Sequence, residues 1–438
     1  MNLNLKNNKV VNAWCMYDWS NSVYNLVITS TIFPVYYSSV TRNFFGGEKV
    51  QFLGLEITNT VLYSYSISFS FLAIALFSPL LSGIADYGGM KKLFLRIFTY
   101  IGVAACITLY FFDGSNIELG IFASIVASIG YSGSLVFYNA FLPEITTSDR
   151  YDIVSAKGYA MGYAGSLLLL LFNLISITFP DWFGFANGGE ASRFAFLLVG
   201  VWWLGFSLIP FHFLPTNPYN RKPAGKLLAH GYKEVRKVFR SLRELPSMRR
   251  YLKAFFFYNM GVQTVMFLAA TFGDKELKLP GEKLILTVLI IQVVAVAGSY
   301  LFAYVSKIKG NKISLSIMVV IWILVCLGAY FVTSAMQFYV VATVVGLVMG
   351  GIQSQSRSAF SKLIPENTID HASYFSFYDV TEKLSIVIGT FAYGLIEQLT
   401  GSMRNSTLAL ATFFILGLFF LRQTNFKIIR LPKAEEAK

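Results

Sequence analysis

The sequence has little charge and few residues that commonly hold metal ions. Only 13% of its 438 residues are charged and 55% are hydrophobic, whereas about 25% charged residues is usual for soluble domains. Its cysteines, Cys15, Cys106 and Cys326, stand alone in separate apolar stretches, which argues against a disulfide framework or a zinc site. The three histidines are also separated. We therefore expect a polytopic membrane protein without a metal site or a cofactor.

Motifs for several soluble functions are missing as well. No GxxxxGK[ST] occurs, which excludes ATP-driven transport by this chain alone. No nucleophile, base and orienting group have the spacing of a hydrolase, so we expect no enzyme. A net charge of +13 would suggest nucleic-acid binding in a soluble protein. Here the basic residues cluster between apolar segments, as the topology rule for membrane proteins predicts, so we expect no nucleic-acid partner.

Twelve stretches are long and apolar enough to cross a membrane, which takes about 20 residues of helix. They form two sets of six, at 14–39, 60–84, 93–112, 120–142, 153–179 and 194–214, and at 251–272, 284–306, 313–332, 336–358, 374–399 and 404–421. The sequence thus predicts an all-α membrane protein. Its parts are an N-terminal six-helix half (1–214), a cytoplasmic basic linker (215–250), and a C-terminal six-helix half with a short cytoplasmic tail (251–438).

Lys and Arg lie mainly on one side of the predicted spans. With the N-terminus inside, the outer segments keep only Arg42, Lys49, Arg193, Lys275, Lys278, Lys283 and Arg404 of the 36 basic residues. Because cytoplasmic loops are enriched in Lys and Arg, both termini are predicted to be cytoplasmic. The linker stretch KLLAHGYKEVRKVFRSLRELP predicts a basic amphipathic helix that lies on the inner leaflet and binds anionic lipids. A solvated helix that joins the halves is the alternative.

Polar residues follow one face of the first predicted span. Asp18, Ser22, Asn25 and Thr29 recur at i, i+4, i+7 and i+11, with Asn21 on the adjoining edge. A buried acid costs about 2.5 to 3.5 kcal/mol on insertion scales, so this face should meet protein or water rather than lipid. We expect Asp18 to bind solute or a proton. A structural ion pair near the cytoplasmic edge is the alternative.

Several short motifs resemble those of known transporters. The loop SGIADYGGMKKLFLR contains Asp86, Gly89, Lys91 and Lys92 as D-x-x-G-x-K-K, which resembles the signature of the major facilitator superfamily at this loop. Ser82 stands where the family usually has glycine. YDWSNSVY, FYNAFLPE, YNMGVQT, GGIQSQSRSAFSKLIP and FSFYDVTEKLSIVIGT are together similar to the autophagy-linked vacuolar amino-acid effluxers and their bacterial relatives. The resemblance implies the twelve-helix major facilitator fold and the bacterial cytoplasmic membrane.

The resemblance also implies a central cavity, which the first, fourth, seventh and tenth spans surround. The candidates for solute contact are Asp18, Asn21, Asn25, Tyr131, Asn139, Asn259, Gln263 and Gln353. Amides, hydroxyls and aromatic rings suit a small polar or zwitterionic solute, although hydrogen bonds between helices explain each residue almost as well. Met260 stands where many relatives would carry an acid, so Asp18 becomes the first candidate for a proton carrier, and Glu382 is the second.

Charged residues near the inner ends of the spans form a candidate gate. Asp379 and Glu382 lie four residues and one residue before Lys383, so Lys383 and Asp379 can pair along one helix. By resemblance, Asp86 meets the start of the eleventh span, where the helix dipole favours a carboxylate. The predicted gate comprises Asp86, Lys91, Lys92, Lys157, Arg357, Asp379, Glu382 and Lys383. A permanent structural pair is the alternative.

The sequence therefore predicts a monomeric secondary active or facilitative transporter that moves a small polar solute by alternating access. The family resemblance suggests neutral amino acids or short peptides as the solute. Two other functions remain open. A lipid or drug exporter would have a larger and more apolar cavity, and a membrane sensor or scaffold that does not transport would lack a continuous cavity.

Overall fold

Long helices make up most of the regular structure. The computed structural model describes residues 7–221, 226–400 and 402–426, so the ends of the two predicted halves and residues 222–225 of the linker lie outside the described part. Within the described part, nine helices are long and apolar enough to span a membrane, and the bent pair Pro246–Phe267 and Thr271–Leu277 makes ten. The remaining two predicted spans, the first and the eleventh, are interrupted or rich in polar residues.

Among the described residues, the N-terminal half contains eight α-helices. They are α1 (Asn8–Val23), α2 (Phe33–Phe45), α3 (Asn59–Gly88), α4 (Lys91–Thr108), α5 (Ile117–Asn139), α6 (Leu142–Ile145), α7 (Tyr151–Thr178) and α8 (Gly188–Phe213). Short 3-10 turns follow α4 (η2, Leu109–Phe111) and α7 (η3, Pro180–Phe183). Two of these helices are short. The helix α2 completes the first predicted span, and α6 follows the fourth.

The linker and the C-terminal half add seven helices. They are α9 (Leu227–Glu244), α10 (Pro246–Leu277), α11 (Gly281–Lys309), α12 (Asn311–Phe331), α13 (Ala335–Leu363), α14 (His371–Thr400) and α15 (Met403–Arg422). The helix α9 occupies the predicted amphipathic stretch and packs along α3. The approach is close, because a Cβ on Gly83 would collide with the carbonyl oxygen of Gly231.

The first span differs from the regular helix that the polar spacing predicts. A π-helical segment, η1 (Tyr24–Ile32), joins α1 to α2, so that helical backbone runs from Asn8 to Phe45. A π-helix has more residues per turn than an α-helix. The regular α-helix that the spacing of the polar stripe assumes is therefore wrong beyond Val23, where Asn25 and Thr29 lie in the π-helical segment.

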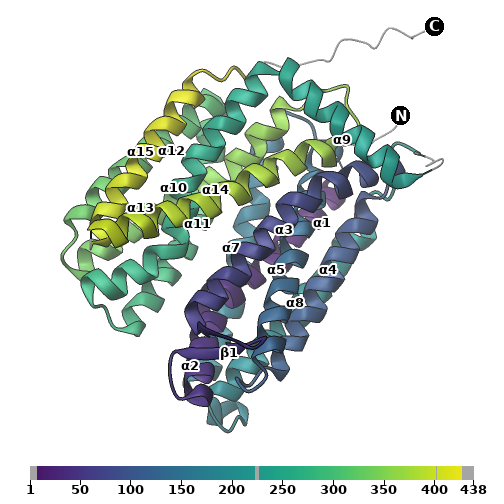
Figure 1. Ribbon diagram of the computed structural model, residues 1–438. Helices are drawn as coiled ribbons and strands as arrows, with labels where there is room; N and C mark the ends of the chain where they lie inside the picture. The colour runs from purple at the N-terminus through teal and green to yellow at the C-terminus, as the bar shows by residue number, and fades with distance from the viewer. Residues whose placement is uncertain (1–6, 222–225, 401, 427–438) are drawn as a thin grey trace, which may run out of the picture.

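A β-hairpin that the sequence reasoning missed connects α2 to α3. The strands β1 (Lys49–Phe52) and β2 (Leu55–Thr58) are antiparallel, with Lys49 opposite Thr58. Leu53 and Gly54 form the two-residue turn and both have positive φ, at 49° and 81°. Two positive φ values are characteristic of the turns whose twist matches that of a hairpin. The hairpin lies beside α2 at one end of the molecule (Figure 1).

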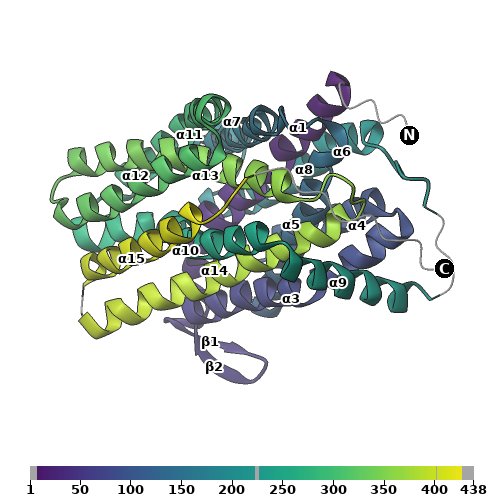
Figure 2. The ribbon, with the colours of Figure 1, turned by 90° about the horizontal axis from the view of Figure 1, so that it is seen from above.

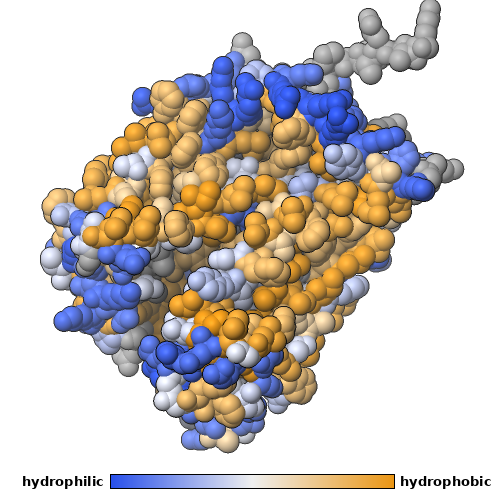
Figure 3. Space-filling model, viewed as in Figure 1, coloured by the Kyte–Doolittle hydropathy of each residue, from blue (hydrophilic) through white to orange (hydrophobic). Residues whose placement is uncertain are grey.

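The two halves meet at one end of the molecule and diverge toward the other (Figure 1). The end that carries α9 is called here the α9 end, and the opposite one the hairpin end. Between the halves, α7 lies beside α11 along one edge and α3 lies beside α14 along the other (Figure 2). Hydrophilic residues gather toward both ends of the face in Figure 3, with a mainly apolar surface between them. This pattern fits a protein that crosses a membrane.

Glycines allow the closest helix contact of the C-terminal half, between α11 and α13. A Cβ on Gly350 would overlap the carbonyl oxygen of Ala295, and a Cβ on Gly298 would overlap that of Leu347. Neither obstacle is a flexible side chain, so the backbones themselves would have to separate. Small residues that let helix backbones approach are common where membrane helices pack.

We predict that Gly350→Ala lowers the stability of the purified protein, because overpacking typically costs about 1–3 kcal/mol. Gly328→Ala is the matched control, since a Cβ on this glycine of α12 would meet no atom within 4 Å. Denaturant unfolding in micelles measures both variants. Equal stability of Gly350→Ala and Gly328→Ala would contradict the packing account.

Candidate functional site

A buried ion pair links the two halves. Nη2 of Arg357, on α13, lies 3.0 Å from Oδ2 of Asp18, on α1. The residues are only 1% and 4% exposed. The hydroxyl of Tyr138, on α5, also donates to Oδ2 of Asp18 at 2.8 Å. The carboxylate is thus neutralised and hydrogen-bonded, which is what a buried charge requires.

Within the described part of the chain, the other guanidinium contacts of Arg357 are also with the N-terminal half. Its Nε donates to Oγ of Ser155 at 2.9 Å and its Nη2 donates to the carbonyl of the same residue at 3.0 Å. Nη1 donates to Oδ1 of Asn139 at 3.3 Å. The guanidinium carbon lies 4.6 Å from the ring centre of Trp14 and 4.3 Å from that of Tyr159. A cation of the C-terminal half is therefore enclosed by three helices of the N-terminal half, α1, α5 and α7.

A second buried carboxylate joins the halves, and the sequence reasoning missed it. Asp152, in the first turn of α7, accepts hydrogen bonds from four residues of the other half. The donors are Ser306 at 3.0 Å, Asn311 at 2.8 Å, Lys362 at 2.7 Å and Ser358. The sequence places Asp152 just outside the fifth predicted span, and nothing in its spacing signals that partners from α11, α12 and α13 converge on it.

Asp86 accepts hydrogen bonds from the start of α14. Its carboxylate accepts a hydrogen bond from the backbone N–H of Ser373 at 2.7 Å and another from that of Ala372 at 3.3 Å. The first N–H groups of a helix have no partner within the helix, and the helix dipole favours a negative charge there. The two lysines of the same loop point elsewhere. Lys91 pairs with the buried Glu144, and Lys92 donates to the carbonyl of Leu214 at 2.6 Å.

Glu144 and His371 connect this loop to the other half. Glu144, from the FLPE stretch after α5, contacts Nδ1 of His371 at 3.0 Å as well as Lys91. His371 is the first residue of α14. Both side chains are buried. The sequence analysis did not predict this contact.

The linker is attached to the same region through Asp370, which immediately precedes α14. Arg221 and Lys237 contact the two carboxylate oxygens of Asp370 at 2.8 and 2.7 Å. Burial raises the pKa of this carboxyl, but the hydrogen bonds and charges of Lys237 and Arg221 outweigh burial and hold the pKa below its usual value. Arg221 also donates to the carbonyl of Asp86. The linker therefore bridges both halves at the α9 end.

A small polar cavity lies where α7, α10, α13 and α14 converge. Its volume is about 10 Å³, which is room for about one water molecule. It is lined by Tyr159, Phe255, Tyr258, Asn259, Gln263, Ile352, Gln353, Ser356, Tyr378 and Glu382. The structure thus brings together the predicted solute contacts Asn259, Gln263 and Gln353, and it adds Glu382, which was assigned to the gate.

The amides of this cavity are held by specific contacts. Nδ2 of Asn259 donates to Oγ of Ser385 at 2.6 Å, and Nε2 of Gln263 lies 3.5 Å from Oε1 of Glu382. The hydroxyl of Tyr163, on α7, donates to Oε1 of Gln353, on α13. The cavity therefore spans the boundary between the halves, and polar groups from both sides reach it.

Asp379, Glu382 and Lys383 lie together on α14, next to this cavity. Nζ of Lys383 is 3.4 Å from Oδ1 of Asp379 and 3.4 Å from Oε2 of Glu382. The pairing that the sequence predicts for Lys383 and Asp379 is present. These residues contact one another rather than the Asp86 region, and Lys383 also lies 5.7 Å from the ring centre of Phe71, on α3.

The other predicted residues lie within the N-terminal half. Asn139 contacts Arg357, whereas Tyr131 packs 5.1 Å from the ring of Tyr24. Asn21 is buried and Asn25 is half-buried in η1. Lys157 donates to Oδ1 of Asn12 at 2.6 Å, which is a contact between α7 and α1 and does not cross to the other half.

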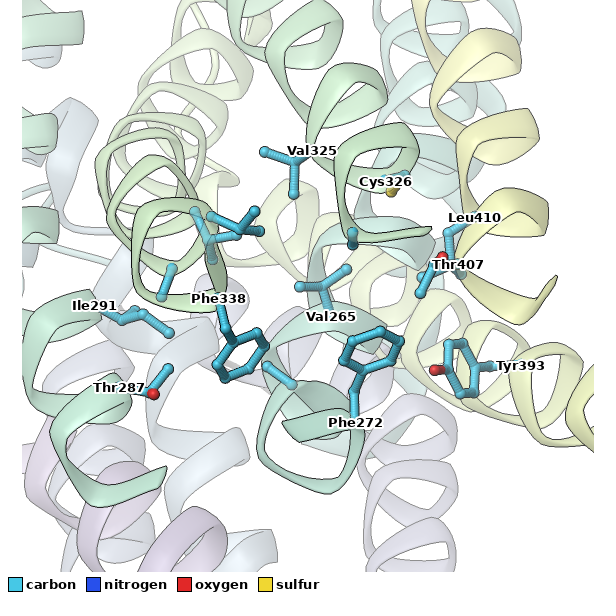
Figure 4. Close-up of a pocket in the computed structure, with 15 residues that line it drawn as sticks. Val265, Phe272, Thr287, Ile291, Val325, Cys326, Phe338, Tyr393, Thr407 and Leu410 are labelled. Carbon is cyan, nitrogen blue, oxygen red and sulfur yellow. The ribbon is translucent and has the colours of Figure 1, made fainter. Parts of the chain in front are cut away.

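A larger cavity of about 60 Å³ lies inside the C-terminal half (Figure 4). Its walls come from α10 to α15 and are mainly apolar, with Val265, Phe272, Ile291, Val325, Phe338 and Leu410 among the labelled residues. Tyr393, Thr287 and Thr407 are the labelled residues with hydroxyl groups. Because this cavity is enclosed by one half, its walls are not the surfaces at which the halves meet.

We predict that Asp18→Asn and Arg357→Gln each destabilise the protein strongly, because removing one partner of a buried ion pair costs about 3–5 kcal/mol. The double variant should recover part of this loss, since it leaves no unpaired charge. Denaturant unfolding of the four proteins in micelles gives the coupling energy. Strictly additive losses in the double variant would contradict an energetically coupled pair.

We also predict that Asp152→Ala opens the α9 end more often. Hydrogen bonds to a charged group contribute about 1.5–3 kcal/mol each, so labelling of a cysteine placed at the buried Ser354 should accelerate roughly tenfold or more. The measurement uses a hydrophilic maleimide in a background whose native cysteines are replaced by alanine. Asp113→Ala, in a loop of the hairpin end, is the control. Equal labelling rates in both variants would argue against an Asp152 lock.

Comparisons with known proteins agree with this architecture. The family model described as "Vacuole effluxer Atg22 like" matches residues 6–427. The chain is 30% identical over 421 residues to the "Uncharacterized MFS-type transporter YxiO" of Bacillus subtilis (strain 168), covering 94% of each chain. These matches extend across both halves and the linker.

Two solved structures share the fold at low sequence identity. The human organic anion transporter MFSD10 (TETRAN) superposes with a TM-score of 0.74 at 12% identity, over 94% of this chain and 99% of that one. The transporter FucP in its outward conformation gives 0.69 at 13% identity, over 95% and 98%. The predicted all-α membrane fold is therefore confirmed, and the chain belongs to the Atg22-like vacuole effluxer family of major facilitator transporters.

Proposed function

We propose that the protein is a secondary active or facilitative transporter that moves small polar solutes, such as neutral amino acids or short peptides, by alternating access. The observation that carries this proposal is that polar side chains of both halves meet around the small polar cavity, and that buried ion pairs join the halves toward the α9 end. We further propose that the α9 end faces the cytoplasm of a bacterial cell, with both termini there, so that the described state is open to the outside.

The contacts at the α9 end supply a gate. Asp86, Lys91, Lys92 and Arg357 of the sequence-based gate join Asp152, Glu144 and Lys362 in it. Buried ion pairs lose in desolvation much of what they gain in attraction. Replacing these ion pairs by contacts with water as the halves separate therefore costs far less free energy than the number of ion pairs suggests. This balance lets a solute that binds both states unequally shift the population between them.

The chemistry of the cavity supports a zwitterionic solute. Glu382 offers a carboxylate for an ammonium group, and the amides of Asn259, Gln263 and Gln353 offer donors for a carboxylate. A lipid or drug exporter is supported by one observation, the apolar cavity of the C-terminal half. That cavity lies inside one half, where alternating access would not expose it to each side in turn. A sensor or scaffold without transport has no observation in its favour.

The linker helix supports a contact with anionic lipids. Leu228, Tyr232 and Phe239 of α9 are 66%, 63% and 50% exposed, and basic residues follow along the same helix. Apolar and basic side chains on one surface helix favour the boundary of an anionic leaflet. A monomer is the proposed unit of transport.

Uptake into proteoliposomes tests the proposal. We expect radiolabelled neutral amino acids or dipeptides to accumulate above the level of empty liposomes. Gln263→Ala should reduce apparent affinity by about two- to tenfold, the value of one ordinary hydrogen bond. Thr343→Ala, an exposed position of α13, is the control. Movement of only lipids or apolar drugs would favour the exporter, and background uptake of every compound would favour the sensor or scaffold.

A further inference from the structure

Asp379, Glu382 and Lys383 lie together on α14 and are called here the α14 triad. Their net charge indicates a role besides solute binding. We propose that this triad is a proton-binding site, which takes up one proton from one side of the membrane and releases it to the other. The coupling role rests on the proposed transport function. Binding of the proton does not, because it needs no solute.

The triad carries more negative than positive charge. Lys383 lies 3.4 Å from a carboxylate oxygen of Asp379 and 3.4 Å from one of Glu382, so one cation faces two acids. Glu382 comes eleven residues after the start of α14 at His371, or about 16 Å along the helix. This depth is well inside the membrane, where an uncompensated charge is costly. One added proton makes the triad neutral.

One oxygen of the triad lacks a donor. Asp379 is 4% exposed, and within the described part of the chain its Oδ2 has no hydrogen-bond partner. Asp18 provides the contrast, because its Oδ2 receives both Arg357 and Tyr138. A carboxylate held by two donors is stabilised in its charged form, whereas one with an unpaired buried oxygen is not. The proton therefore belongs on α14 rather than on Asp18, the residue that the sequence favours.

Neighbouring elements bring no second cation to the triad within the described residues. Phe71 of α3 lies against Lys383, and α10 contributes the amides of Asn259 and Gln263. The titratable groups that sense Glu382 are phenols, namely Tyr131 of α5, Tyr159 of α7 and Tyr378 of α14 itself. Among the cations of other packed helices, Arg357 pairs with Asp18, Lys237 of α9 with Asp370 and Arg404 of α15 with Glu276.

The position of the triad gives it access to both sides in turn. Glu382 lines the small polar cavity, and its side chain is 23% exposed. Lys383 lies against Phe71, at the contact of α14 with α3 of the other half. Separation of the halves at the α9 end would expose the triad at this contact between α3 and α14. A group that is reached first through the cavity and then through the α3–α14 contact meets the requirement for carrying a proton across.

Infrared difference spectra between mildly alkaline and mildly acidic samples of the full-length protein test this site, without solute. We expect acidification to add the carbonyl band of a buried protonated carboxyl group. The band should disappear in Asp379→Asn or in Glu382→Gln. It should persist in Glu397→Gln, which removes an acid of the same helix that pairs with Lys275 at 3.2 Å.

The results of this experiment distinguish failure of the proton site from failure of the transport proposal. Absence of the band from the unsubstituted protein, its persistence in both triad variants, or its loss in Glu397→Gln would overturn the proposal. If an amide variant fails to fold, Glu382→Asp keeps the acid and should shift the band rather than remove it, and an unshifted band would count against the site. Failure of solute uptake with the band present would reject the transport proposal and leave the proton site standing.

Discussion

Burial of the Arg357 charge is the constraint on which the interface between the halves depends. A guanidinium that is 1% exposed needs an anion, hydrogen-bond acceptors and aromatic faces, and here all of them come from the opposite half. Asp18, Ser155, Asn139, Trp14 and Tyr159 supply these groups. Gly158 leaves the space for them, because a Cβ there would collide with the carboxylate of Asp18. The helices α1, α7 and α13 are therefore positioned as one unit while this pair is formed.

The other polar links follow the same logic at the α9 end. Asp152 gathers donors from α11, α12 and α13, and Asp86 receives the first N–H groups of α14. Each half thus inserts a carboxylate or a cation into the other, and each such group is satisfied only while the halves touch. Polar links of this kind favour one defined arrangement more than they add stability. An interface built in this way is suited to opening and closing, whereas an apolar interface of the same size would stay closed.

The fold could be predicted from the sequence to a larger extent than the site. Apolar length predicted most of the helices, because it depends on local composition, and the D-x-x-G-x-K-K loop together with the other short motifs indicated the family. The predicted solute contacts Asn259, Gln263 and Gln353 do line one cavity, as expected of amides that face protein in a membrane helix. Asp152 and Glu144 were not predicted, because their partners in the other half lie more than 150 and 200 residues away and carry no common spacing. The π-helical segment at Tyr24–Ile32 was likewise not predicted.

The central claim is that the two ends of the interface open alternately. Distances between spin labels at exposed positions test it, with one pair at Asn12 and Lys312 across the α9 end and another at Trp182 and Met336 across the hairpin end. The account predicts two populations in lipid nanodiscs, in which a longer Asn12–Lys312 distance always accompanies a shorter Trp182–Met336 distance. It also predicts that Arg357→Gln enlarges the population with the longer Asn12–Lys312 distance. A single Asn12–Lys312 distance that is unchanged in Arg357→Gln would contradict it.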